Sequence, residues 1–555
     1  MEGSSRAAYT LLPTSEHVEL SEKTSKFKGH SRTNSSQLIQ GQAWQRRNSR
    51  TDSSQYVEST MGYGSLEWSI GAFMTEGYLK SKEYLGDLLS ARWKDFLVSL
   101  LPSFAQPSAP SHAAPRKVHK TAWLDGLRGV ASFMVMFHHS SWLWYPHLSR
   151  GWGSCSDCYY IVQLPIIRVF YMGSAMVAIF FVISGFSLSH RALGLIRSGM
   201  FPELLDSLSS STFRRGMRLI LPTVVVTFFM MLATYFGFYA TGPGNRQPPR
   251  YEKFSQNLYH WYLTVLDISD IFRPMNYPGW YNPPYDTNLW TIDVEFHGSL
   301  VIFLTLLGLS KVQANFRLLV LIAIPLWLLY YVHTHLFLFM AGVFLAELHH
   351  IREDRLQSVN SQNLDPSSPI PSQPRFLETL IPQLYWPKVR MSFWIINFLI
   401  ALHVLSMPLL HEGAESSPGF RALVYYIPTS FRRPYVEDHF WIFLAAVHLI
   451  WCIDNAPFLQ AIFTTKIATY LGKISFGLYL IHGTFLYTIG YNLSRNIHDY
   501  VGRETTLQYT GGVILTALVM YPLLFWCADV VYRHVDARSV AVAKWCHQKV
   551  SVGAK

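Results

Sequence analysis

Three ionisable residues in the run 123–145 are the first candidates for chemistry. Asp125 and Arg128 stand near its start, and His139 follows the arginine by eleven residues in an apolar stretch. An α-helix turns by about 100° and rises by about 1.5 Å per residue, so Arg128 and His139 share one face about 16 Å apart. An ionisable residue inside a membrane helix is a functional-site candidate by default. The spacing therefore predicts a reaction path that enters the bilayer.

The composition supports a membrane setting for this run. Half of the 555 residues are hydrophobic and 15% are charged, against about 25% charged residues in soluble domains. We therefore predict an all-α fold, a polytopic membrane helical bundle. The net charge of +11 is scattered over loops between apolar runs, which fits membrane orientation better than nucleic-acid binding. We expect no nucleic-acid partner and a lipid bilayer as the environment.

Apolar runs long enough to span a hydrocarbon core of about 30 Å recur along the chain. We count about ten, near 123–145, 170–189, 217–240, 288–309, 317–333, 334–349, 391–410, 438–453, 470–490 and 509–531. Basic residues cluster before the first run and after the second, sixth and last ones. Placing these clusters in the cytosol also places the N-terminus there. We expect a multi-pass protein of an ER-like endomembrane or of the plasma membrane.

The remaining segments set the domain boundaries. Residues 1–77 are polar and predict a disordered cytosolic tail. Within 78–115, apolar residues at helical spacing up to Leu101 predict an amphipathic interfacial helix, followed by a linker. A helix packed on the cytosolic face of the protein itself is the alternative. Residues 116–535 form the transmembrane domain, and 536–555 form a cytosolic C-terminal tail.

Two cysteines, Cys155 and Cys158, fall in the first lumenal loop of this topology. A C-x-x-C pair there is compatible with a disulfide, a redox pair or half of a metal site. No second His/Cys pair stands nearby at zinc spacing. We therefore expect no metal site and predict a structural disulfide.

Five motifs, in order, resemble those of the acyltransferase-3 family of integral membrane O-acyltransferases. They are LDGLRGVA at 124–131, IFFVISGF at 179–186, FRRGMRLILP at 213–222, LWTIDVEF at 289–296 and ISFGLYLIH at 474–482. The resemblance covers about residues 120–535, and the long polar N-terminal segment suggests a fungal member. It implies transfer of acetyl or other short acyl groups from acyl-CoA to hydroxyls. In the fourth motif Phe296 follows Glu295, where the family often has a second acid.

The resemblance and the chemistry of acyl transfer together suggest catalytic roles. His139 is the expected general base that removes the hydroxyl proton. Glu295, with Asp293 as the alternative, is expected to hold the imidazole and to stabilise its charged form. A histidine that only bonds a neighbouring helix is the alternative for His139, and it is what we expect for His138.

The expected substrate-binding residues are mostly basic. Arginine binds phosphate groups in a bidentate manner, which suits the pyrophosphate and 3′-phosphate of CoA. The candidates are Arg128, Asp125, Arg214, Arg215, Arg218, Trp290 and His482. Ordinary positive-inside topology is the alternative for the three arginines of the third span, and a hydrogen bond within its own helix is the alternative for His482. We expect acyl-CoA, most simply acetyl-CoA, as co-substrate, with no bound cofactor and no metal.

The acceptor is not fixed by the residues. Glycans, sterols or terpenoids, polyketide-like metabolites and lipids all carry suitable hydroxyls, and we favour a small-molecule metabolite or glycan. A proton-coupled membrane transporter, in which buried His and Glu relay protons, is the alternative function. It is less favoured because the sequence lacks an internal repeat with broken helices at matching positions.

Overall fold

The computed structural model describes residues 98–103, 106, 119–240, 248–270, 282–364, 387–433 and 436–551. Every regular element in these ranges is helical, which confirms the all-α class for this part of the chain. The predicted tail 1–77 and most of the predicted interfacial helix lie outside the described residues.

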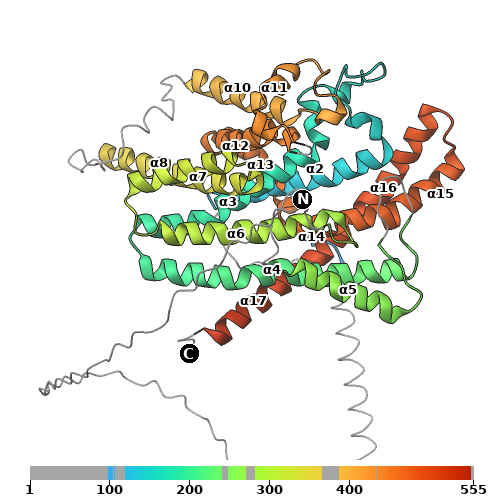
Figure 1. The fold of residues 1–555 in the computed structure, drawn as a ribbon, viewed down its shortest axis with the longest axis horizontal. Coiled ribbons are helices and arrows are strands. Elements are labelled where there is room, and N and C mark those ends of the chain that lie inside the picture. Colours follow the sequence, from blue (N-terminus) through green and yellow to red (C-terminus); the bar gives the residue numbers. More distant parts are fainter. Residues whose placement is uncertain are drawn as a thin grey trace, which may run out of the picture. The chain divides into compact units, whose positions relative to one another are not determined.

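Long helices alternate with short turns along the chain (Figure 1). The longer ones are α2 (Ala122–Trp144), α3 (Gly173–Arg197), α4 (Phe201–Tyr235), α5 (Phe254–Ile268), α6 (Trp290–Gly308), α7 (Ala314–Tyr330), α8 (Thr334–Leu364), α10 (Pro387–Leu405), α12 (Phe440–Asn455), α14 (Lys466–Phe485) and α16 (Thr506–Val531). The shorter ones are α11 (Arg421–Tyr425), α13 (Pro457–Phe463), α15 (Tyr491–Val501) and α17 (Ala537–Val550). The 3-10 turns are η1 (Pro146–Ser149), η2 (Ile161–Gln163), η3 (Ile167–Tyr171), η4 (Thr287–Leu289), η5 (Leu410–Glu412), η6 (Thr429–Phe431) and η7 (Glu437–His439), and the π-helical turns are η8 (Leu486–Gly490) and η9 (Tyr532–Asp536).

Within the described ranges, six helices are long and apolar enough to cross a bilayer, namely α3, α4, α6, α8, α10 and the continuous α16–α17. The pair α12 and α13 adds a seventh if its two helices, bent by 106°, form one span. The predicted count of about ten is therefore not confirmed. The difference arises because α7 has only 17 residues and because α2 and α14 carry ionisable side chains among their apolar ones.

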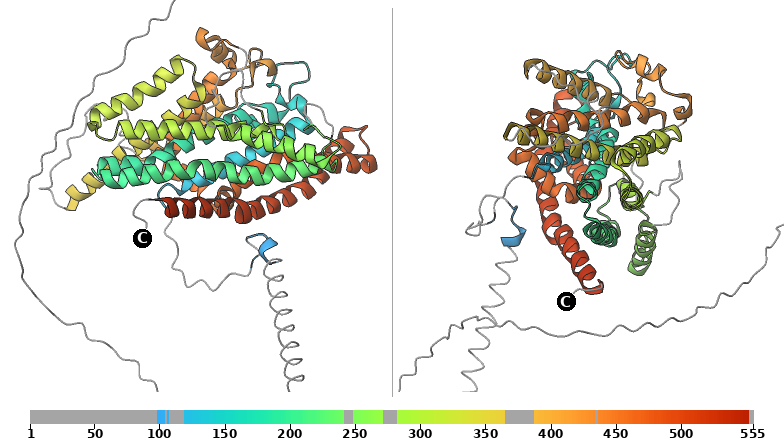
Figure 2. Two further views of the ribbon diagram at one scale, coloured as in Figure 1. Left: turned by 60° about the horizontal axis from the view of Figure 1, so that its bottom comes forward. Right: turned by 90° about the vertical axis from the view of Figure 1, so that its left-hand side faces the viewer.

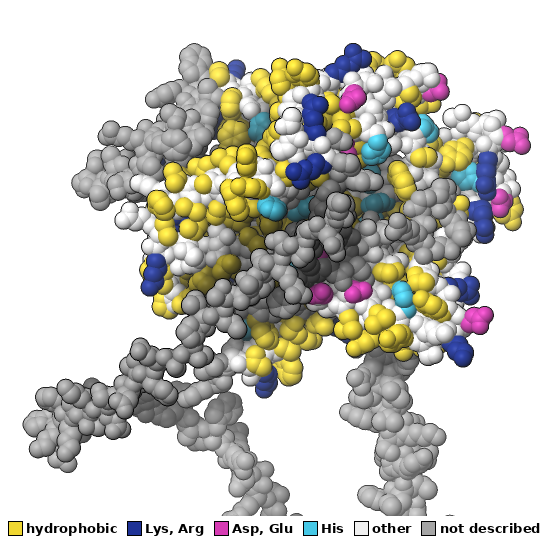
Figure 3. Space-filling model, in the orientation of Figure 1, with side chains coloured by type: hydrophobic (Ala, Val, Ile, Leu, Met, Phe, Trp, Pro, Cys, Tyr) yellow, Lys and Arg dark blue, Asp and Glu magenta, His cyan; other side chains and the backbone are white. Residues whose placement is uncertain are grey.

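Large hydrophobic side chains are exposed on the outside of the bundle. Phe229 of α4 is 63% exposed, Leu304 of α6 is 71% exposed and Leu518 of α16 is 66% exposed. Figure 3 shows broad hydrophobic patches on one face of the molecule. Apolar surface on this scale is costly in water and suits contact with lipid, as a multi-pass membrane bundle requires.

Two helix pairs pack with their backbones almost in contact. α2 crosses α14 at Gly129 and Gly472, where a Cβ atom on Gly129 would lie 2.1 Å from the Gly472 nitrogen. α3 crosses α8 at Gly185 and Gly342, where a Cβ atom on Gly342 would lie 2.3 Å from a carbonyl oxygen of α3. Small residues allow such close approach between membrane helices. The crossing at Gly129 and Gly472 holds the part of α2 that carries Arg128 and His139 against α14.

α6 packs against three other helices. It runs alongside α4 in Figure 1 and in the left view of Figure 2, and it also contacts α3 and α8. Residues of α6 can therefore face α3 and α4, so the fourth motif lies beside the helices that carry the second and third motifs.

The structure describes part of the expected C-terminal tail and the end of the expected interfacial segment. Residues 537–550 form α17, which packs along α4. The described end of the interfacial segment contacts α16, since the Trp526 indole N–H donates to the Leu100 carbonyl at 2.6 Å. The backbone N–H of Ser103 also donates to the Asp529 carboxylate at 2.7 Å. These contacts place the described end of the segment against α16, and the choice between the two expectations for the whole helix stays a prediction.

The turns η1 to η3 form a cap between α2 and α3. Cys155 and Cys158 form the predicted disulfide within it. Arg168 of η3 is 1% exposed and pairs with Glu412 of η5 at 2.6 Å. This buried ion pair ties the cap to the segment that follows α10.

Candidate active site

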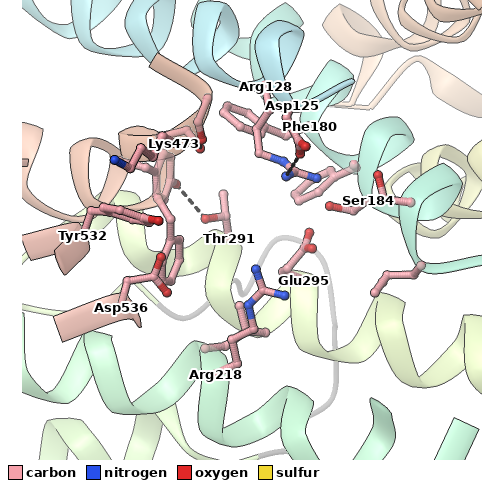
Figure 4. Close-up of a pocket in the computed structure, with 18 of the residues that line it drawn as sticks. Asp125, Arg128, Phe180, Ser184, Arg218, Thr291, Glu295, Lys473, Tyr532 and Asp536 are labelled. Atoms are coloured by element: carbon pink, nitrogen blue, oxygen red, sulfur yellow. Dashed lines mark hydrogen bonds and ion pairs between the residues drawn. The ribbon is translucent and has the colours of Figure 1, made fainter. Parts of the chain in front are cut away.

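A cavity of about 1100 Å³ lies between α2, α3, α4, α6, α14 and η9, and we call it the large cavity. Figure 4 shows charged side chains from several of these helices pointing into it. Its basic side chains are Arg128, Arg215, Arg218, Lys466 and Lys473, and its acidic ones are Asp125, Glu295 and Asp536. The basic residues exceed the acidic ones by two, so the cavity favours anions.

α2 contributes Asp125 and Arg128 to the lining of the large cavity, and their side chains are 70% and 28% exposed. The Arg128 guanidinium donates to the Asp125 carboxylate at 3.0 Å (Figure 4). Residues three apart on a helix lie on the same side, so this pair follows from the spacing. Arg128 has five N–H donors, and the carboxylate leaves some of them for another anion.

The three arginines of α4 have different surroundings. Arg215 forms an ion pair with Glu295 of α6, and Arg218 points into the large cavity near the same carboxylate (Figure 4). Arg214 donates to a carbonyl of its own helix at 3.0 Å. The structure thus gathers two of the three predicted arginines at the cavity and leaves Arg214 outside its lining.

A second cavity, of about 170 Å³, holds His139, and we call it the small cavity. His138, Trp290, His335 and His439 also line it. Trp290, a predicted substrate-binding residue, therefore faces a cavity. Among the described residues His139 has no hydrogen-bond partner, so its ring nitrogens are available to a substrate.

The structure does not bring His139 and Glu295, the predicted pair, into one cavity. Glu295 lines the large cavity and pairs with α4, and the alternative Asp293 pairs with His297 at 3.0 Å. Trp290, at the start of α6, lines the small cavity with His139. A helical rise of 1.5 Å per residue puts Glu295 about 7.5 Å further along α6. There Glu295 pairs with Arg215 of α4.

Three side chains line both cavities, namely Val177, Phe181 and Tyr479. The Tyr479 hydroxyl lies 2.6 Å from the Thr291 hydroxyl and donates to the Asn288 carbonyl at 2.6 Å. These contacts hold the phenol in place at the boundary. The two cavities therefore adjoin, with Arg128 and His139 of one helix on either side.

His482, a predicted substrate-binding residue, lies beside His139 and away from the lining of both cavities. Its ring centroid is 5.2 Å from that of His139, and the residue is 1% exposed. Its Nδ1 donates to the Tyr479 carbonyl at 2.7 Å. This is the hydrogen bond within α14 that the three-residue spacing allowed.

Several charged or titratable residues that line the cavities were not predicted from the sequence, among them Asp536 of the large cavity. Lys466 and Lys473 of α14 add two cations to the large cavity, and His335 and His439 add two imidazoles to the small one. Lys473 directly precedes the ISFGLYLIH motif, so its position was an available signal. His335 and His439 stand at a helix start and in a turn, where no spacing pattern marks them.

Comparison with known proteins adds three fungal relatives. A family model described as an acyltransferase domain matches residues 121–525. The O-acetyltransferase PaAT-1 of Phomopsis amygdali is 34% identical over 479 residues, which cover 83% of this chain and 90% of that protein. Acyltransferase clz18 of Cochliobolus lunatus is 24% identical over 76% of this chain and 95% of its own length. Acyltransferase R4 of a Phoma species is 23% identical over 76% and 94%. No solved structure matches the chain.

Proposed function

Because the chain belongs to this acyltransferase family, we propose that it transfers an acetyl or other short acyl group from acyl-CoA to a hydroxyl of a small-molecule metabolite or glycan. Family membership makes it a multi-pass membrane O-acyltransferase, an enzyme with an acyl donor and a hydroxyl acceptor. This replaces the alternative of a transporter. The observation that carries the finer proposal is an anion-favouring cavity that adjoins a histidine-lined one.

The large cavity is the proposed site of acyl-CoA. Its volume of about 1100 Å³ slightly exceeds the range of about 300–1,000 Å³ typical of small-molecule sites. Arg128, Arg218 and Lys473 supply cationic donors for the phosphates of CoA. In this arrangement the phosphates bind near the open end, and the thioester extends toward Tyr479.

The proposed reaction uses His139 as general base. A ring nitrogen of His139 takes the acceptor's hydroxyl proton while the oxygen attacks the thioester carbonyl carbon. The new C–O bond gives a tetrahedral oxyanion, which collapses as the C–S bond breaks. The CoA thiolate leaves and takes the proton back from the imidazolium, so the enzyme returns to its starting state.

The small cavity is the proposed entry for the acceptor hydroxyl. At about 170 Å³ it is below the usual size of a ligand pocket, so only the hydroxyl-bearing end of an acceptor fits inside. Trp290, Phe181 and Phe443 give it mainly aromatic walls. We infer that the remainder of the acceptor lies outside this cavity.

We propose a cytosolic N-terminus and location in an ER-like endomembrane or the plasma membrane. Three basic residues of the large cavity, Arg128, Arg218 and Lys473, then lie toward the cytosolic side. Acyl-CoA is made available from that side, so donor and basic residues share one compartment.

His139→Ala tests the proposal. We expect a loss of about 10²–10⁴-fold in kcat, the usual contribution of a general base. The measurement is thiol release from acetyl-CoA by the purified full-length protein in lipid nanodiscs, with an extract of candidate acceptor alcohols. His411→Ala is the matched control, because His411 is an exposed histidine of η5 away from both cavities. We expect the control to retain wild-type turnover. Wild-type turnover by His139→Ala would refute the general-base role.

A further inference from the structure

Three histidine rings stand in a row where α2 meets α14. The centroid of His139 lies 5.0 Å from that of His138 and 5.2 Å from that of His482. His139 is the member that faces the small cavity without a hydrogen-bond partner in the described part of the chain. Each of its neighbours is anchored to a backbone carbonyl at 2.7 Å.

The backbone bond of His482 fixes which of its nitrogens carries the proton. A carbonyl oxygen only accepts, so the Nδ1 atom that faces the Tyr479 carbonyl must carry a hydrogen. In the neutral ring, Nε2 then has a lone pair and can only accept. This Nε2 atom is fully buried and has no hydrogen-bond partner among the described residues, an arrangement that native proteins rarely leave without a reason.

We propose that His482 is a positioning residue whose Nε2 accepts a hydrogen bond from the ring N–H of His139 during the reaction. This fixes the tautomer of His139 and stabilises its protonated form. It is the role that a carboxylate plays beside the base in many hydrolases. The inference rests on the proposed function, because it takes His139 to be the base.

The surroundings of His139 favour His482 over other partners. Glu295 is engaged by Arg215 and lines the other cavity. His138 packs against the start of α3, where a Cβ atom on Gly173 would lie 2.5 Å from its ring. The rings of His139 and His482 are tilted by 37°, and hydrogen bonds of this kind often form fully only when substrate binds.

The proton balance agrees with this role. The acceptor O–H bond breaks, and the proton joins the His139 nitrogen that faces the cavity. The other ring nitrogen of His139 keeps its hydrogen and donates it to Nε2 of His482. His482 stays neutral throughout, and His139 later gives the acquired proton to the departing thiolate.

Two substitutions at His482 separate positioning from a merely structural role. In His482→Asn, the side-chain N–H can still donate to the Tyr479 carbonyl, but the acceptor toward His139 is lost. In His482→Gln, the longer side chain can place its oxygen where Nε2 stood, while the bond to Tyr479 is lost. We expect kcat to fall about 100-fold in the Asn variant and about 10-fold or less in the Gln variant. The KM for acetyl-CoA should stay within about threefold in both, because only the reacting state is affected.

The assay is steady-state thiol release with acetyl-CoA, accompanied by thermal unfolding of each variant in nanodiscs. Equal losses in the two variants, a better retained Asn variant, or a change confined to KM would each overturn the inference. If the Gln variant fails to fold, ¹⁵N spectra of histidine-labelled protein give a second test. The wild type should show one tautomer of His139 and His482→Asn a mixture, and an unchanged tautomer would overturn the inference. Full activity of His139→Ala would instead refute the general-base role of His139, on which this inference rests.

Discussion

Gly129→Ala should separate α2 from α14 and reduce turnover. The new Cβ atom would lie 2.1 Å from the Gly472 nitrogen. Real Cβ atoms essentially never approach another heavy atom closer than 3.0 Å, so this contact is 0.9 Å too short. The opposing atoms are backbone, so no side-chain rotation can relieve the clash. The helices must therefore move apart by about 1 Å at the point where Arg128 and His139 are held.

The size of the effect has two parts. Overpacking a tight contact costs about 1–3 kcal/mol, and the better helix propensity of alanine returns only about 0.5–1 kcal/mol. A misplacement of about 1 Å can cost about 100-fold in rate. We expect a lower apparent Tm and a kcat reduced by about 100-fold, measured by thermal unfolding and thiol release in nanodiscs.

Gly511→Ala is the matched control for this prediction. Gly511 lies within α16, and a Cβ atom there would meet no atom within 4 Å. This variant gains helix propensity without a clash, so its apparent Tm should equal or exceed that of the wild type, with unchanged kcat. Wild-type Tm and kcat in Gly129→Ala would refute the argument that this crossing fixes the site.

Two further predictions concern charged residues. Arg218→Gln should raise the KM for acetyl-CoA about tenfold, because it removes a charge-assisted bond to phosphate. Initial rates at varied acetyl-CoA concentration measure this KM. An unchanged KM would contradict the prediction. Arg168→Met should destabilise the fold by about 3–5 kcal/mol, because it leaves the buried Glu412 without its partner. Thermal unfolding measures this, and Arg168→Met with Glu412→Gln should recover part of the loss. No recovery in the double variant would contradict the explanation by unpaired charge.

Sequence reasoning was strongest where residues act within one helix. The Asp125–Arg128 pair follows from a spacing of three, and the bond of His482 to the Tyr479 carbonyl follows from the same spacing. Five motifs also predicted the family that the comparisons show. Local periodicity fixes which side chains share a face, and the structure keeps those relations.

Relations between helices were harder to predict. Nothing in the sequence states at what depth α6 lies against α2, so Glu295 was expected beside His139. The residue of α6 that lines the small cavity with His139 is Trp290, which lies about one and a half turns from Glu295 along the helix axis. The partners of Glu295 come from α4, and two histidines of the small cavity come from α8 and η7. The number of spans was also uncertain, because a helix that carries ionisable residues toward a cavity is less apolar than one that faces lipid.

The side chains common to both cavities bear on a competing reaction. Water is the smallest nucleophile that could attack a thioester, and an enzyme that admitted it would waste its donor by hydrolysis. Val177 and Phe181 offer water no hydrogen bond, and the Tyr479 hydroxyl is already engaged by two oxygens. In the proposed arrangement the thioester meets the acceptor hydroxyl beside these residues, and their side chains offer water few hydrogen bonds there. The same boundary then makes the arrival of an alcohol the condition for breaking the thioester.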